Sequence, residues 1–477
     1  MQMIRAATRE IVKLMIQRRC FVSFGIRSTF AVSALAVLQL FLYIEIYRLG
    51  NLSQTIFVFL VDYVLLFGSY VVTFVFCRSS DLESGNRFLQ AVLVVFPLMF
   101  RMIMIMAETS LSTDIFRYMW DGMLLANGID PYKYVPSSRQ LQSFQNIYYY
   151  EIYDHKDELT VYPPVAQYLF SVSYALFGAS QKGFKSVITI FDILNGLLIA
   201  LVIMKLGAKR TAYLGAMLYL WNPLVIVEFS GSGHVDAFAI FFLLLSIYML
   251  LNLSTFNSAA SLAASSMTKW ITLPIIPFYL KAVFKQKPRF LLRAISSLVI
   301  CSLVIVLPFI LNSGFNFVTS VAKFASNWRF ESALSRLFVF ILNANSLEEF
   351  LVLKVLSYIM FAVLYVTIFF KARISGTAWL IDYSILTVCL LYLIVPAVYP
   401  WYSIWLLALT SLRNGFRHWT SISSTGIAVV NYAQQFCQLS NVLFWGLYAL
   451  WYVPVFAIIL SYLPRSWILR TYRVRSW

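Results

Sequence analysis

Repeated apolar stretches of close to 20 residues constrain this chain more than any other feature. A helix of about 20 residues crosses the roughly 30 Å hydrocarbon layer of a bilayer. Lipid offers no partner for backbone amides, so each crossing segment has to bond internally as a helix. Hydrophobic residues make up 61% of the chain and charged residues 12%, a composition outside the soluble globular range. The sequence therefore predicts an all-α polytopic membrane protein, with a single transmembrane domain over residues 1–477.

We expect about 14 spans from the length and hydropathy of the apolar stretches. They are predicted near residues 29–48, 55–77, 88–107, 186–204, 211–229, 235–252, 256–268, 270–283, 290–311, 350–370, 376–395, 401–412, 420–437 and 441–463.

The net charge of +17 would suit a nucleic-acid partner only if the basic residues formed a soluble patch. They lie instead in short loops between spans, which the positive-inside rule places in the cytoplasm. We therefore expect the lipid bilayer as a partner and no nucleic acid. Every basic loop is cytoplasmic if the N-terminus is inside and the apolar segment 163–178 does not cross. We place that segment in the membrane interface or as a re-entrant piece, with Pro164 in the first turn of a short helix.

The same arrangement puts the polar segments on one outer face. Residues 108–185 form a first outer loop with interfacial helices, and residues 312–349 form a second outer loop. The short turns at 229–235, 268–270 and 395–401 reach the same face. Residues far apart in the sequence are thus expected to meet in one site.

A helix is predicted over residues 113–127 of the first loop. Ser112 or Thr113 can cap its start, and Gly128 suits a left-handed residue after its end. On this helix Asp114, Arg117, Tyr118 and Asp121 recur at three- and four-residue intervals and share one face, with apolar residues on the other. The helix dipole favours the carboxylate form of an acid in the first turn. The alternative is an ordinary surface helix with an intrahelical ion pair.

The polar segments carry a set of short motifs. They read Asp-Ile-x-Arg-Tyr-x-Trp-Asp-Gly from residue 114, Asn-Gly-Ile-Asp-Pro-Tyr from 127, Tyr-Pro-Pro from 162, Trp-Asn-Pro from 221, Gly-His-x-Asp-Ala from 233 and Tyr-Pro-Trp-Tyr from 399. This combination, spread over residues 90–410, resembles bacterial polyprenol-phosphate-mannose-dependent alpha-mannosyltransferases and their relatives in the GT-C superfamily. The resemblance implies a membrane enzyme that moves a sugar from a lipid monophosphate carrier to an acceptor hydroxyl on the non-cytoplasmic face. It also implies a catalytic base in the first large outer loop, where Asp114 matches.

Displacement of a phosphate leaving group requires cationic or hydrogen-bonding groups for the charge that develops on the phosphate. Arg117, Lys269 and Arg329 are the candidates, because arginine and lysine both bind phosphate. His234 and Asp236 are expected to form hydrogen bonds with the sugar or the phosphate. The predicted sugar and acceptor site comprises Tyr118, Trp120, Asp121, Asp130, Tyr132, Tyr162, Glu228, Tyr399, Trp401 and Tyr402. For each aromatic residue the alternative is a place in the aromatic belt of the membrane interface.

No metal or other cofactor is predicted. Glu228, His234 and Asp236 lack a second nearby histidine, so a divalent metal is the weaker interpretation. The five cysteines show no CxxC spacing, which argues against a metal site or a disulfide framework. Within the spans, Asp62 and Arg101 lie at similar depth and are expected to form a buried ion pair.

We therefore predict an inverting glycosyltransferase of the bacterial plasma membrane, monomeric, with its active site on the outer face. Mannose is the sugar that the resemblance implies. The acceptor is left open among a glycan, a glycolipid and a protein. Inversion follows from direct attack by the acceptor hydroxyl, because no second carboxylate is placed to form a glycosyl-enzyme. The alternatives are a lipid or solute transporter or flippase, against which the chain shows no repeat, and a non-enzymatic scaffold.

Overall fold

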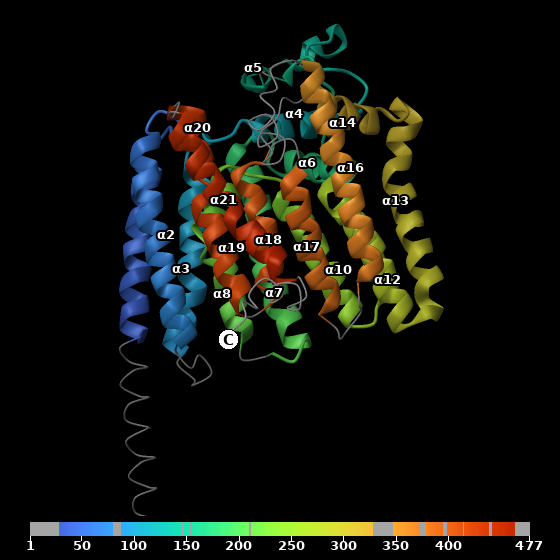
Figure 1. The fold of residues 1–477 in the computed structure, drawn as a ribbon. Coiled ribbons are helices and arrows are strands. Elements are labelled where there is room, and N and C mark those ends of the chain that lie inside the picture. Colours follow the sequence, from blue (N-terminus) through green and yellow to red (C-terminus); the bar gives the residue numbers. More distant parts are fainter. Residues whose placement is uncertain are drawn as a thin grey trace, which may run out of the picture.

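The computed structural model describes most of the chain. The described ranges are residues 28–79, 87–145, 147–152, 155–208, 211–327, 347–372, 378–394, 398–413, 415–437 and 441–462. Helices and turns account for these ranges, and no strand occurs in them. The prediction of an all-α membrane protein is confirmed (Figure 1).

Long apolar helices form a bundle (Figure 1). Within the described residues, six helices are long and apolar enough to cross a membrane: Ser28–Arg48, Ile56–Ser79 (α2), Arg87–Met106 (α3), Gln181–Lys205 (α7), Pro288–Ser313 (η6, Pro288–Phe290, with α13, Leu291–Ser313) and Lys354–Lys371, in α16 (Leu347–Lys371). A seventh crossing results if Ala212–Leu220 and Pro223–Gly231, which meet at a bend of 51°, count as one span. The bend lies at Trp221-Asn222-Pro223, where proline cannot donate to the helix.

Other helices occupy the remaining segments where spans are predicted. They are α8 (Ala212–Leu220), α9 (Pro223–Val225), the π-helix η4 (Ile226–Gly231), α10 (Asp236–Leu251), α11 (Thr255–Ser266), η5 (Trp270–Ile275), α12 (Ile276–Gln286), α17 (Trp379–Ile394), η7 (Pro400–Tyr402), α18 (Ser403–Thr410), α19 (Phe416–Ile427), α20 (Val430–Cys437) and α21 (Asn441–Ser461). Several are well below the length of a straight crossing. The count of about 14 spans stays a prediction.

The segment that is predicted to form the first outer loop folds at one end of the bundle. It contains α4 (Asp114–Ala126), η1 (Arg139–Phe144), α5 (Ile147–Glu151) and α6 (Pro164–Phe177). Helix α14 (Asn316–Asn327) lies at the same end (Figure 1).

Helix α4 has nearly the bounds that the sequence predicts. The Ser112 hydroxyl accepts the Asp114 N–H at 3.3 Å, and Gly128 adopts φ +76° after the helix. The burial of α4 differs from the expected two-sided pattern, because every side chain from Ile115 to Leu124 is buried. The cause is tertiary: α6 and α7 pack against α4 from the bundle side and the loop around α5 covers it. The predicted proline start of α6, at Pro164, is also confirmed.

Gly122 permits the close packing of α4 on α6. A Cβ at this position would lie 2.4 Å from the backbone oxygen of Phe170. Because a backbone cannot rotate away as a side chain can, Gly122→Ala is expected to push the two helices apart and to lower the thermal stability of the purified protein by several degrees. The control is Gly68→Ala within α2, where a Cβ meets nothing within 4 Å and alanine favours the helix. Equal melting temperatures for the two variants would contradict this account.

The buried charges pair differently from the prediction. Arg101 contacts Asp192 at 2.7 Å and donates to the Pro97 and Leu220 carbonyls. The expected pair between Asp62 and Arg101 is therefore wrong. Estimated depth in the sequence points to Asp62, but the packing of α3 against α7 brings Arg101 to Asp192 instead.

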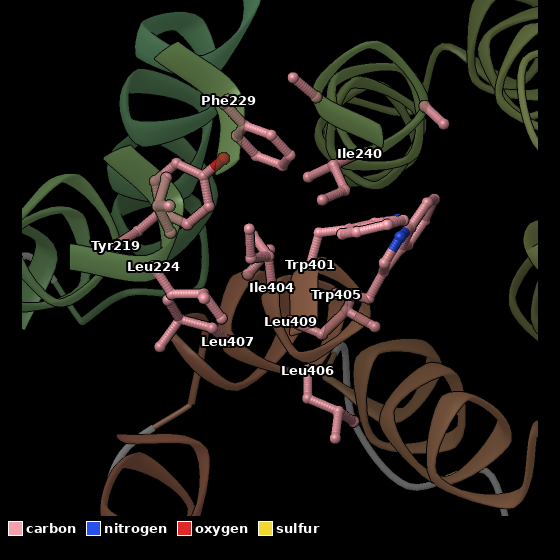
Figure 2. Packing of buried hydrophobic residues seen from close by; sticks show 14 of the residues in the cluster. Tyr219, Leu224, Phe229, Ile240, Trp401, Ile404, Trp405, Leu406, Leu407 and Leu409 are labelled. Atoms are coloured by element: carbon pink, nitrogen blue, oxygen red, sulfur yellow. The ribbon is translucent and has the colours of Figure 1, made fainter. Parts of the chain in front are cut away.

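The core beneath the loop layer connects distant segments. Figure 2 shows residues of η7 and α18, including Trp401, Ile404 and Trp405, packed against Phe229 of η4 and Ile240 of α10. This packing brings the turn at residues 399–402 beside the turn that carries His234.

Candidate active site

A cavity of about 520 Å³ opens between the first-loop layer and the turns from the core. Its walls come from the start of α4, the segment 152–163, the start of η5 and the turn 399–402. Seven of the predicted site residues line it: Asp114, Arg117, Tyr162, Lys269, Tyr399, Trp401 and Tyr402. These seven residues from separate loops thus lie around one cavity, and their roles in binding and catalysis stay predictions.

Asp114 is the first residue of α4 and stands at the wall of the cavity. Its side chain is 32% exposed. The Tyr118 hydroxyl donates to Oδ2 at 3.4 Å, and His234 Nδ1 lies 3.6 Å from the same oxygen. Backbone N–H groups at a helix start favour a negative charge there. The site therefore holds a carboxylate that is open to the cavity and supported from behind.

Lys269 contributes an ammonium group to the lining. Its Nζ forms an ion pair with the fully buried Asp236 and lies 4.8 Å from the centre of the Tyr402 ring. The second oxygen of Asp236 accepts the Trp405 indole N–H at 2.7 Å. Because Asp236 is held on both oxygens, it fixes the cation that faces the cavity. Asp236 itself does not line the cavity.

Arg117 points into the protein more than the prediction assumed. Its Nε donates to Asp121 at 2.9 Å, and its Nη1 donates to the carbonyls of His155 and Glu158. Arg117 thereby fastens the 155–158 wall of the cavity to α4. Among the predicted phosphate ligands, Lys269 is the cation best placed to meet an anion, and Arg329 lies outside the described residues.

Aromatic rings form one side of the cavity. Trp401 stacks on His234, with ring centroids 3.6 Å apart, and on Tyr399 at 4.6 Å. Burial raises the pKa of Tyr162 and of Tyr402, and the Asp114 carboxylate adds to both effects. Both hydroxyls therefore stay protonated at neutral pH. Flat rings with neutral hydroxyls suit the apolar faces and the hydroxyls of a sugar.

Comparison with known families decides what kind of site this is. A family model described as "Alpha-(1->6)-mannopyranosyltransferase, N-terminal domain", of the MptA_B family, matches residues 24–285, more than half of the chain. The chain belongs to this family. It is therefore a membrane glycosyltransferase of a mannosyltransferase family, and the resemblance to GT-C mannosyltransferases is confirmed. No curated protein matches it.

The matched region of this mannosyltransferase includes most of the site. Asp114, His234 and Lys269 lie within it, whereas the turn at 399–402 and α20 follow it in the chain. The C-terminal part thus closes a cavity whose charged groups belong to the family domain.

Four predicted sugar-binding residues lie behind the cavity wall. Trp120 is buried against Tyr149, and Asp121 binds Arg117. Asp130 accepts the Tyr132 N–H at 2.8 Å, and the Tyr132 hydroxyl donates to the Tyr162 carbonyl. Burial raises the pKa of Asp130 above its ordinary value. None of these four residues lines the cavity. Their contacts stabilise the fold of the loop, and we expect them to affect a ligand only by positioning the lining residues.

Tyr118, Glu228 and His234 also lie outside the lining. Tyr118 stacks on Phe170 and reaches Asp114 with its hydroxyl. His234 is fully buried beside Asp114, and the fully buried Glu228 contacts the other nitrogen of His234. Tyr118 and His234 thus lie next to the Asp114 carboxylate and Glu228 lies behind His234, all three away from the space that a ligand would fill.

Several lining residues are not among the residues predicted from the sequence. His155 and Glu158, 3.2 Å apart, together with Trp270 and Gln435, line the cavity. Nothing in their local sequence distinguishes them, because their place depends on how the loop folds over α4.

Lys185 is a further residue that the sequence did not single out. It is fully buried at the start of α7, and its ammonium donates to the carbonyls of Met104, Ala107 and Gly231. It thereby ties the end of α3 to the turn that precedes His234. Its only sequence signal is a lysine within the first turns of an apolar helix.

The acidic and histidine side chains do not converge on one point. Asp236 contacts Lys269 and Trp405, whereas Glu228 contacts His234 and Tyr432. Among the described residues there is no group of three or more His, Cys, Asp or Glu arranged to hold a metal ion.

Proposed function

We propose that this protein transfers mannose from a polyprenyl-phosphate carrier to an acceptor hydroxyl, with inversion at the anomeric carbon. The observation that carries the proposal is one cavity lined by the Asp114 carboxylate, the Lys269 ammonium and stacked aromatic rings. These are the groups that displacement of a phosphate by a hydroxyl requires.

The reaction is a single displacement. The acceptor oxygen attacks the anomeric carbon while its proton passes to the Asp114 carboxylate. The bond from the anomeric carbon to the phosphate oxygen breaks, and the carrier phosphate leaves with the electron pair toward Lys269. One displacement inverts the configuration, whereas retention requires a second carboxylate as nucleophile.

A lipid carrier suits the remainder of the cavity. Besides its polar groups the lining includes Leu111, Ile152, Trp270, Ile271 and Leu391, which are suited to an isoprenoid chain. The surrounding helices are apolar enough to lie in a membrane, where such a carrier resides. A nucleotide-sugar donor would call for groups that bind a diphosphate, and Lys269 is a single point charge.

The positive-inside pattern supports a site on the non-cytoplasmic face, in a bacterial plasma membrane. We further propose that the protein works as a monomer and needs no divalent metal, because a monophosphate leaving group can be neutralised by a basic side chain.

The direct test uses purified full-length protein in nanodiscs with radiolabelled polyprenyl-phosphate mannose and crude membrane glycolipids as acceptor. We expect label to enter the glycolipids from this donor and not from GDP-mannose. The same rate is expected with EDTA. NMR of the product should show the inverted anomeric configuration.

Other outcomes would point elsewhere. Transfer from GDP-mannose would show that the donor is a nucleotide sugar and not a polyprenyl-phosphate sugar. Loss of transfer in EDTA would show that the enzyme requires a divalent metal. Movement of the carrier across the bilayer without transfer would favour a transporter.

A further inference from the structure

We infer that His234 is a positioning residue that holds the Asp114 carboxylate in place and is itself held by Glu228. This inference rests on the proposed role of Asp114 as the base that accepts the hydroxyl proton. It changes the role of His234 from a ligand of the donor to a support of the base.

A tight turn brings His234 beneath the start of α4. Gly233 has φ +78°, a left-handed conformation that favours glycine. A Cβ at Gly233 would lie 2.8 Å from Ile115 Cδ1, so the turn approaches α4 more closely than another residue would allow. The His234 N–H donates to the Glu228 carbonyl at 3.1 Å, which closes the turn.

The imidazole lies between two carboxylates. Nδ1 is 3.6 Å from Asp114 Oδ2, and Nε2 is 3.2 Å from Glu228 Oε2. These distances fall within ion-pair range, although neither contact is a hydrogen bond in this structure. The ring is fully buried, and a buried polar atom without a partner costs about 1–3 kcal/mol. A side chain that served packing alone would be apolar, so the two nitrogens indicate a function.

Glu228 is anchored on its other side. It is fully buried, and its Oε1 accepts the Tyr432 hydroxyl of α20 at 2.7 Å. A line of polar groups therefore runs from Tyr432 through Glu228 and His234 to Asp114. Of these four, Asp114 lines the cavity.

The two oxygens of Asp114 differ in their contacts. Both the Tyr118 hydroxyl and His234 Nδ1 approach Oδ2. We assign Oδ1 to the acceptor hydroxyl. A protonated imidazole donates from both nitrogens, so in that form the ring can donate to Asp114 Oδ2 with one N–H and to Glu228 with the other. Such support holds a base near its working geometry, where small displacements cost rate.

Paired substitutions in the same nanodisc assay separate this role from packing and from donor binding. His234→Phe keeps a ring to stack on Trp401 and removes both nitrogens. His234→Asn removes the ring and keeps an amide that can reach the place of Nδ1. We expect His234→Phe to lower kcat about 30-fold with the donor KM within twofold of wild type, and His234→Asn to recover at least a third of the lost rate.

A second background tests whether His234 acts through Asp114. Asp114→Glu moves the carboxylate and breaks its fit to the ring, so His234→Phe should lower the remaining rate less than threefold there. The control is His418→Asn, at a buried histidine of α19 that packs on Phe74 of α2. Phe74 lies about 27 Å along α2 from the first residue of that helix, Ile56. This control should keep the wild-type rate.

Two results would overturn the inference. A donor KM raised more than tenfold with kcat unchanged would make His234 a donor ligand. Equal losses from His234→Phe in the wild-type and Asp114→Glu backgrounds would make its effect independent of Asp114. Failure of the wild-type protein to transfer mannose would refute the proposed function instead, so the two failures are distinct.

Discussion

Replacement of Asp114 by asparagine is expected to lower the turnover number about 1000-fold, the range that removal of a general base produces. Asparagine has the same shape, and Asp114 forms no strong ion pair whose loss would unfold the protein: its contacts to Tyr118 and His234 are 3.4 and 3.6 Å. Folding should therefore be unchanged. The measurement is single-turnover transfer from radiolabelled polyprenyl-phosphate mannose, with the melting temperature of each preparation.

The matched control is Asp157→Asn, at an exposed aspartate of the same loop that accepts a hydrogen bond from Ser137. It should keep the wild-type rate. If Asp114→Asn retained more than a few per cent of the turnover, the base would have to be another residue. Asp121 would be next in sequence, but its ion pair with Arg117 and its bond from Gln167 make it a poorer base than the sequence alone suggests.

Loss of the Lys269 charge is expected to have the second largest effect. Lys269→Met should lower kcat/KM for the donor about 100-fold, or about 2.7 kcal/mol of transition-state stabilisation, because the leaving phosphate loses its cation. The same change leaves the buried Asp236 with the Trp405 N–H and no cation. An unpaired buried charge costs about 3–5 kcal/mol of folding stability, so the single variant should also melt at a lower temperature.

A double variant separates these two effects. Lys269→Met with Asp236→Asn removes the unpaired charge and should regain most of the melting temperature without regaining activity. Lys269→Arg, which keeps a positive charge, should retain more activity than Lys269→Met. Wild-type kcat/KM in the double variant would mean that Lys269 only balances Asp236.

The agreement between sequence and structure is closest where local chemistry decides. The bounds of α4 follow from Ser112 before it and Gly128 after it, and α6 begins at the proline that the sequence places in its first turn. The apolar stretches also place most helices, because lipid leaves the backbone no other way to bond. Hydropathy alone does not give the number of spans, because many of these helices are short or bent. The break at Asn222-Pro223, for example, depends on a neighbouring helix, since the Asn222 side chain donates to Thr425 of α19.

The sequence by itself determined the class of protein, helices α4 and α6 of the first loop, and seven of the residues that line the cavity. Only the tertiary structure decided the partners across helices: Arg101 with Asp192, Lys269 with Asp236, and Glu228 with Tyr432. The physical reason is that helical periodicity fixes which residues share a face of one helix. The rotation and depth of each helix against its neighbours fix which faces touch, and they depend on packing contacts across the whole chain.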